Sequence, residues 1–161
     1  MATAFIALGS NLGNREKHLA EAVDQLRNLP DTKIITVSTW YETAPVGGPP
    51  QGLFLNGVVQ LQTPLTPHPL FSHLQKIEQD LGRPAEHPRL GPRVIDLDLL
   101  SYDGLVYQSP ELIIPHPRLH ERRFVLEPLA EIAPSWKHPQ MGQSASELLR
   151  ELHHADHPSA G

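Results

Sequence analysis

Apolar and polar positions alternate or cluster along the chain in ways that predict four strands. Residues 4–8 form a short apolar run, which is consistent with a buried strand. Residues 33–41 are rich in Ile, Val, Thr and Trp, and residues 54–62 alternate between apolar and polar side chains. Residues 94–102 follow as a fourth strand, and Asp103-Gly104 after them is a strong hairpin signal.

Two amphipathic helices are predicted between these strands, because apolar residues recur there at spacings of three and four. Asn14 is a plausible N-cap of the first helix and Pro30 closes it, whereas Gly82 stops the second. Residues 124–132 and 144–154 also have helical patterns. The apolar stripes are Leu19, Ala22, Val23 and Leu26 in the first helix, and Leu70, Leu74, Ile77 and Leu81 in the second.

The resulting order is strand, helix, strand, strand, helix, strand, followed by further helices. This order predicts an α+β fold of the ferredoxin-like split βαβ type. Its sheet should be rich in antiparallel pairs, with helices on one face and extra helices at the C-terminal end. No linker-like stretch divides the chain, so residues 1–161 are expected to form a single domain, with a frayed tail over 153–161.

The composition excludes several classes of protein. The chain has no cysteine, which removes disulfide frameworks and cysteine nucleophiles and fits a reducing compartment. No apolar stretch approaches the length of a membrane span and no signal sequence is evident, so a cytoplasmic protein is expected. The net charge of −5 argues against a nucleic-acid partner. We expect a monomer that acts on small molecules.

The segment Val94-Ile95-Asp96-Leu97-Asp98-Leu99-Leu100 contains the most informative chemistry. Residues two apart on a strand share a face, so Asp96 and Asp98 should point the same way, about 7 Å apart, with Ile95, Leu97 and Leu99 facing the core. Two carboxylates so placed suit Mg²⁺, which takes hard oxygen ligands and substrate phosphates. Taken alone, the triplet is more simply interpreted as the solvated polar face of an amphipathic strand.

The surroundings of the aspartate pair favour function. Arg83 and Arg93 stand on the loop that leads into the strand, and arginine is suited to phosphate oxygens. His116 between two prolines, followed by Arg122 and Phe124, adds a second cationic group and an aromatic ring. Taken singly, each of these is also typical of a surface arginine or a proline-locked turn.

A second candidate site lies near the middle of the chain. Thr43-Ala44-Pro45-Val46-Gly47 is a proline loop with exposed backbone groups, and Phe54-Leu55-Asn56 follows it. Together they could hold a flat heterocycle by hydrogen bonding and stacking, although a turn capped by an amide is the simpler interpretation. Gly9–Asn14 lacks the residues of a phosphate loop and is interpreted as a structural turn, and Glu78 is expected to be exposed.

Six segments, in order along the chain, resemble the 6-hydroxymethyl-7,8-dihydropterin pyrophosphokinase family of folate biosynthesis. The most specific is GPRVIDLDLL. The others are GSNLGN, YETAPVG, FLN, IEQDLGR and IPHPRLHERRFVLEPL. The resemblance implies a ferredoxin-like fold and an enzyme that transfers pyrophosphate from ATP to the hydroxymethyl group of the pterin, with release of AMP.

The resemblance also implies roles for particular residues. It implies that Asp96 and Asp98 bind two Mg²⁺ ions. Asp98 is also a candidate proton acceptor. The implied pterin-binding residues are Thr43, Pro45, Val46, Phe54, Asn56, Asp96 and Phe124. The implied ATP-binding residues are Gln75, Glu78, Arg93, His116 and Arg122, and Arg83, Arg93 and His116 join Asp98 in catalysis.

The sequence departs from the commoner family pattern at several positions. Ala85 and Leu90 stand where a second arginine and a tryptophan are frequent, and Glu111 replaces a basic residue. These changes bear on ATP binding and loop closure rather than on the reaction. Two other functions stay open from the residues alone: an RNA-binding module of the same topology, and a metal-dependent phosphohydrolase that needs no pterin.

Overall fold

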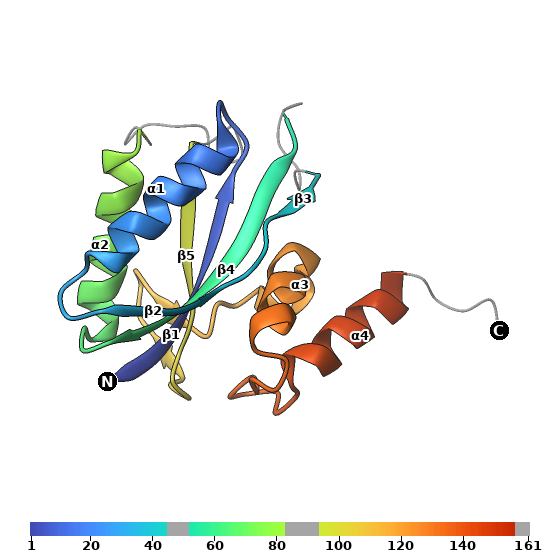
Figure 1. Ribbon diagram of the computed structural model, residues 1–161. Coiled ribbons are helices and arrows are strands. Elements are labelled where there is room, and N and C mark those ends of the chain that lie inside the picture. The colour runs from blue at the N-terminus through green and yellow to red at the C-terminus, as the bar shows by residue number, and fades with distance from the viewer. Residues whose placement is uncertain (45–51, 83–93, 157–161) are drawn as a thin grey trace.

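The computed structural model describes residues 1–44, 52–82 and 94–156. Its centre is an antiparallel sheet with the strand order β2-β4-β1-β5, and β3 pairs with the beginning of β4 (Figure 1). The strands are β1 (Ala2–Ser10), β2 (Lys33–Val37), β3 (Tyr41–Thr43), β4 (Phe54–Thr63) and β5 (Asp96–Tyr102).

Two helices make the crossovers that define the topology. Helix α1 (Arg15–Arg27) connects β1 to β2, and these two strands flank β4. Helix α2 (Pro67–Asp80) connects β4 to β5, and these two strands flank β1. Both units are therefore split βαβ motifs, and the ferredoxin-like α+β prediction is confirmed.

The predicted helix signals act as expected. The Asn14 Oδ1 atom accepts a hydrogen bond from the Lys17 amide at 3.1 Å, so Asn14 caps α1. Gly82 follows the last turn of α2 with a φ of +107°, a conformation that favours glycine. The helices bury the predicted stripes against the sheet: Leu19, Ala22, Val23 and Leu26 from α1, and Leu70, Leu74 and Ile77 from α2.

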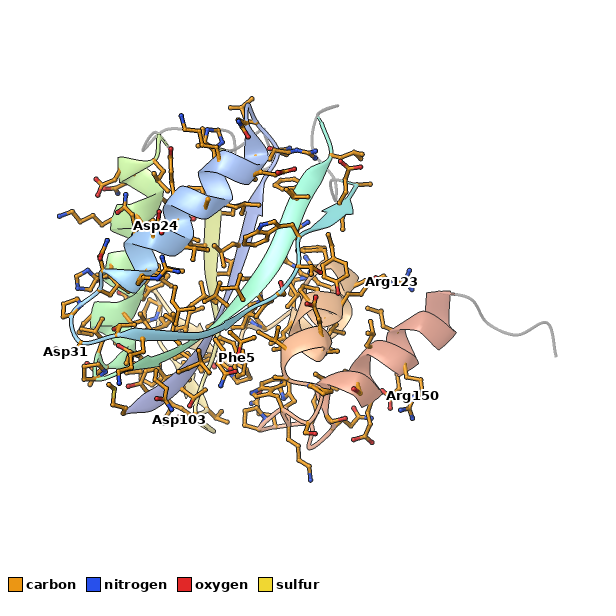
Figure 2. The ribbon with its side chains drawn as sticks, in the orientation of Figure 1. Phe5, Asp24, Asp31, Asp103, Arg123 and Arg150 are labelled. Atoms are coloured by element: carbon orange, nitrogen blue, oxygen red, sulfur yellow. The ribbon has the colours of Figure 1, made fainter. Side chains whose placement is uncertain are left out.

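The two faces of the sheet build two separate cores, because side chains alternate along each strand. On one face, Ile6, Leu61 and Leu97 pack under α1 and α2. On the other face, Phe5 and Val58 meet residues of the C-terminal helices (Figure 2). The extra helices predicted at the C-terminal end thus cover the second face and make a third layer.

The C-terminal third of the chain continues with short elements and two helices. Helices α3 and α4 lie away from α1 and α2 (Figure 1). Helix α4 extends to Asp156, so the tail predicted to fray from His153 begins within its last turn. The elements are β6 (Tyr107–Gln108), β7 (Ile113–Ile114), the 3₁₀ helix η1 (Leu119–Glu121), α3 (Arg123–Ile132) and α4 (Ala145–Asp156).

The single strand predicted over residues 33–41 is wrong, since the structure divides it into β2 and β3. The break follows from Ser38, whose hydroxyl oxygen accepts the hydrogen bond of the Val58 amide at 2.9 Å. The Trp40 ring then packs over Gly57, where a Cβ atom would lie 2.4 Å from two ring carbons. The chain leaves the regular ladder between the two strands as a result.

The hairpin predicted at Asp103-Gly104 is also wrong, although the turn itself forms. The Leu105 amide donates to the Tyr102 carbonyl at 3.0 Å, and Asp103 has a φ of +49°. Strand β6, however, pairs with β7 and not with β5. Asp103 bonds to Thr3 of β1 through both its amide and its Oδ1 atom, each at 2.8 Å, and this ties the turn to the sheet instead (Figure 2).

The outer strands of the sheet have different edges. Strand β2 contains a bulge between Ile34 and Thr36, where its register with β4 shifts. On the other side, the His116 amide donates to the Leu100 carbonyl of β5 at 2.9 Å. The Glu78 Oε2 atom accepts from the Leu97 amide of β5 at 2.8 Å.

In the described part of the chain, no helix is both long and apolar enough to cross a membrane.

Candidate functional site

Asp96 and Asp98 lie together on the face of β5 that points away from α1 and α2. Ile95, Leu97 and Leu99, which alternate with them, are at most 4% exposed in the core under those helices. Asp96 is half-buried and Asp98 is exposed. The sequence-based prediction that the two carboxylates share one face is confirmed.

The register of the sheet places Asp96 in a row with a buried amide. Gly9 of β1 pairs with Asp96 on one side and with Asn56 of β4 on the other. One row along, Ala7 pairs with Asp98 and with Val58. Since directly opposed residues of antiparallel strands point to the same face, Asn56 and the two aspartates line one surface.

The beginning of β4 and the neighbouring strand β3 extend this surface. Thr43 pairs with Phe54, and the Asn56 Nδ2 atom donates a hydrogen bond to the Thr43 Oγ1 atom. Asn56 is only 6% exposed, so its amide has a fixed orientation. The structure thus brings together the described members of the predicted heterocycle site, namely Thr43, Phe54 and Asn56, beside the carboxylates.

Gly9 is a residue of this site that the sequence pattern did not indicate, because Gly9–Asn14 was interpreted as a structural turn. Gly9 belongs to β1, and a Cβ atom there would lie 2.7 Å from Asn56 Oδ1 and 3.6 Å from Phe54 Cδ1. The missing side chain therefore lets the Asn56 amide oxygen lie close to the β1 backbone, in the same row as Asp96. A glycine within a strand often marks such a close approach, and this is the signal that could have identified it.

The segment from His116 to Phe124 borders the same face. His116 is bonded through its amide to Leu100 of β5, and Phe124 packs against the second core at the start of α3. The Arg122 guanidinium lies over the Phe124 ring, 5.5 Å from its centroid. This cation–π contact orients the guanidinium at the N-terminal end of α3.

His116 is held as a neutral hydrogen-bond donor. Burial lowers the pKa of its imidazole to about 4, and the charges of Arg122 and Arg118 act in the same direction. The Nδ1 atom accepts a hydrogen bond from the Arg118 amide at 3.2 Å. A neutral imidazole with an accepting Nδ1 carries its proton on Nε2, so the Nε2–H group is available to an anionic ligand.

The lowered pKa of His116 predicts acid sensitivity. The pKa is near 6.5 in the unfolded chain and about 4 in the folded one, so the unfolded state binds more protons between these values. The free energy of unfolding should therefore fall as the pH falls through this window. Between about pH 7.5 and about pH 5, His116 should account for a fall of about 2 kcal/mol in the free energy of unfolding. This part of the fall should be absent in His116→Gln, as measured by urea denaturation at each pH. Parallel pH profiles for the two proteins would contradict the assignment.

The expectation that Glu78 is exposed is wrong. Its side chain is 7% exposed between α2 and β5, and its Oε2 atom accepts from the Leu97 amide, between the two aspartates. This amide points outward from an edge strand, and a buried amide needs an acceptor. Glu78 therefore fixes β5 at the aspartate pair. Gln75 lies one turn earlier on the same helix and is exposed.

Four of the predicted site residues lie outside the described residues. These are Pro45, Val46, Arg83 and Arg93, and the family departures Ala85 and Leu90 lie there too. Nothing in the structure tests their roles. The functional assignments of the described site residues also stay predictions, although the geometry assembles most of them on one surface.

The donor set of this surface fits a magnesium ion. Within the described ranges, no group of three or more His, Asp or Glu side chains could hold a metal by itself. Two carboxylates on one face of a strand are nevertheless the kind of set that Mg²⁺ uses, because it commonly completes its shell with substrate phosphates and water. Ala7 and Gly9, opposite Asp98 and Asp96 on β1, place no bulky side chain beside them.

Comparison with known proteins identifies one family. The family described as 7,8-dihydro-6-hydroxymethylpterin-pyrophosphokinase matches residues 5–134. A 2-amino-4-hydroxy-6-hydroxymethyldihydropteridine pyrophosphokinase of Bacillus subtilis is 48% identical over 129 residues, which are 80% of this chain and 77% of that protein. The enzyme of the same name in Haemophilus influenzae is 39% identical over 157 residues, 98% of this chain and 96% of that one.

Solved structures with the same fold are found in larger proteins. A crystal structure of an HPPK-DHPS in complex with substrates superposes with a TM-score of 0.75 over 99% of this chain, at 14% identity. A Plasmodium falciparum HPPK-DHPS superposes with a TM-score of 0.72 over 98% of this chain, at 15% identity. This chain spans 45% of the length of each, and at such identities the likeness concerns the fold alone.

Proposed function

Because this chain belongs to the family of 7,8-dihydro-6-hydroxymethylpterin-pyrophosphokinases, we propose that it transfers pyrophosphate from ATP to the hydroxymethyl group of 6-hydroxymethyl-7,8-dihydropterin. The products are AMP and the pterin diphosphate, a step of folate biosynthesis. The observation that carries the proposal is the row Asn56–Gly9–Asp96, which sets a fixed amide beside a carboxylate pair. A heterocycle and a metal-bound phosphate chain could meet there.

The pterin is proposed to bind at the Asn56 end of this row. Asn56 and Thr43 offer a hydrogen-bonding set of the kind that a flat heterocycle with alternating donors and acceptors requires. Phe54 and Phe124 provide rings suited to stacking. Pro45 and Val46 complete the set by the family resemblance, and Asp96 stands where the hydroxymethyl group would point.

ATP is proposed to bind toward His116 and Arg122. The Nε2–H group of the neutral His116 and the oriented guanidinium of Arg122 are both donors to phosphate oxygens. Arg93 adds a further guanidinium by resemblance, and Arg83 is assigned to the same charge stabilisation. Gln75 is proposed to contact the nucleotide, whereas the buried Glu78 acts at least through β5, whose Leu97 amide it holds.

Asp96 and Asp98 are proposed to hold two Mg²⁺ ions. When bound, these ions would supply the positive charge that neutralises the triphosphate. In the transfer, the hydroxymethyl oxygen forms a bond to the β-phosphorus while the bond from that phosphorus to the oxygen bridging to the α-phosphate breaks, and AMP departs with this oxygen. The hydroxyl proton goes to Asp98 or to solvent. The remaining work of the chain is orientation of two substrates and stabilisation of charge.

One assay separates this proposal from a metal-dependent phosphohydrolase. The chain is incubated with ATP and Mg²⁺, with and without 6-hydroxymethyl-7,8-dihydropterin, and AMP is measured by chromatography. We expect AMP only when the pterin alcohol is present, in equal amount to the pterin diphosphate. Release of phosphate or AMP at the same rate without the pterin would reject the proposed acceptor.

The number of domains, the oligomeric state and the compartment are also matters of proposal. We propose a single domain over residues 1–161 that works as a monomer in the cytoplasm, which the cysteine-free composition fits. Light scattering after size-exclusion chromatography should give the mass of one chain. A stable dimer at micromolar concentration would contradict the monomer.

A further inference from the structure

We infer that Arg15, the first residue of α1, is a positioning residue for the pterin pocket. The inference rests on the proposed function of Thr43, Phe54 and Asn56. Arg15 is outside that set and belongs to a different element. Its guanidinium bonds to the residues that immediately precede Thr43 and Phe54 in the chain.

The Arg15 guanidinium joins two segments that are distant in the sequence. Its Nη1 atom donates to the Leu53 carbonyl at 2.9 Å, and its Nη2 atom donates to the Glu42 Oε2 atom at 2.9 Å. Glu42 precedes Thr43 in β3, and Leu53 directly precedes Phe54, the first residue of β4. One planar group therefore spans the common end of the two strands whose side chains form the pocket.

A second contact, from the segment between β1 and α1, supports this arrangement. The Asn11 Nδ2 atom donates to the Gly52 carbonyl at 3.3 Å, one residue before Leu53. Asn11 is 7% exposed and stands between β1 and α1. The segment 11–15 thus holds the chain entering β4 at two successive carbonyls, and Arg15 also reaches β3.

These contacts are better suited to positioning than to stability. The Arg15 side chain is 29% exposed and the Glu42 side chain 52% exposed, and exposed ion pairs of this kind contribute about 0–1 kcal/mol. Thr43 and Phe54 belong to a pair of strands of which β3 has only three residues. A short strand has few ladder bonds of its own, so an external tie at Glu42 has a large share in fixing where Thr43 lies.

Arginine at this position is not equivalent to lysine. The guanidinium offers two terminal nitrogens in a rigid plane, and here each of them serves a different strand. A lysine ammonium is a single point charge, which can keep the attraction to Glu42 without the same two-point geometry. The comparison of the two residues therefore separates positioning from charge.

The test is steady-state kinetics of Arg15→Gln, with separate Michaelis constants for the pterin alcohol and for ATP. We expect the KM for the pterin to rise about tenfold and the KM for ATP to stay within about twofold, because a misplaced binding group affects the substrate that it contacts. The melting temperature should fall by no more than about 4 °C, which shows that the variant is folded.

Three further variants sharpen the result. Arg15→Lys should retain most of the pterin defect, and Glu42→Gln should show a smaller defect, because the bond from Arg15 to Leu53 remains. Arg27→Gln is the matched control: Arg27 lies on the same helix in an exposed ion pair with Asp24, and this variant should behave as the wild type.

The outcomes distinguish this inference from the proposed function. An unchanged pterin KM in Arg15→Gln, or an equal rise of both KM values, would overturn the positioning role while the wild-type activity stands. Full activity of Arg15→Lys would show that charge alone matters and would also overturn it. A wild-type chain that forms no AMP with the pterin alcohol would overturn the proposed function, and the inference with it.

Discussion

Asp98→Asn should lower the rate of pterin-dependent AMP formation at least about a thousandfold, and Asp96→Asn should have an effect of similar size. The substitution keeps the shape of the side chain and removes the negative charge that would hold Mg²⁺. Asp98 is exposed and Asp96 half-buried, so neither change should prevent folding. The measurements are AMP formation over a range of Mg²⁺ concentrations and thermal unfolding of each variant.

The matched control for these variants is Asp24→Asn. Asp24 lies on α1, where it pairs with Arg27 at 2.7 Å and is exposed (Figure 2). The same chemical change there should leave the rate within about twofold, because a surface ion pair contributes little. If Asp98→Asn kept more than a tenth of the wild-type rate at every Mg²⁺ concentration, the metal-binding role of Asp98 would be rejected.

Gly9→Ala should damage the pterin site with little loss of stability. The new methyl group would lie 2.7 Å from the Asn56 Oδ1 atom, so the amide has to move. Asn56 cannot move freely without losing its hydrogen bond to Thr43. We expect the KM for the pterin to rise at least about tenfold, since one displaced hydrogen-bonding group commonly weakens binding by this factor or more.

Gly57→Ala is the informative comparison for Gly9→Ala. Gly57 is the next residue after Asn56 on β4, and a Cβ atom there would lie 2.4 Å from carbons of the Trp40 ring. That substitution should lower the free energy of unfolding by about 1–3 kcal/mol, as overpacking in a core does. If Gly9→Ala instead lowered the free energy of unfolding by a similar amount and left the pterin KM unchanged, the role of Gly9 in the site would be wrong.

The architecture could be predicted from the sequence because it depends on local patterns. The apolar stripes of α1 and α2 and the alternation around Asp96 follow from the periodicity of helices and strands, and the structure buries those residues. The caps at Asn14 and Gly82 follow from the chemistry of helix ends.

The errors share a physical cause, which is pairing between distant residues. The break after Val37 depends on the bond between Ser38 and Val58, and the turn at Asp103 is tied to Thr3 instead of opening a hairpin. Glu78 is buried because the Leu97 amide at the edge of β5 needs an acceptor. Each of these contacts joins residues at least 19 positions apart, which no local pattern reveals.

The candidate site also has a part that local patterns predict and a part that depends on contacts between distant residues. Asp96 and Asp98 could be identified as a pair from their spacing alone. Their meaning came from the arginines on the preceding loop and from the segment His116–Phe124, and the family resemblance made it more specific. The place of Gly9 between Asn56 and Asp96 required the register of three strands. The contacts of Arg15 with Glu42 and Leu53 required the turn that brings α1 beside the end of β3.

The two outer strands of the sheet bear on how this protein behaves at high concentration. An exposed edge with a regular row of free amides and carbonyls is a template on which another chain can add a strand and begin to aggregate. Here the bulge at Ile34 and Thr36 interrupts the ladder of β2, and Glu78 and His116 occupy backbone groups along β5. The contacts that shape the edge of the sheet at Asp96 and Asp98 therefore also protect the molecule from its own copies.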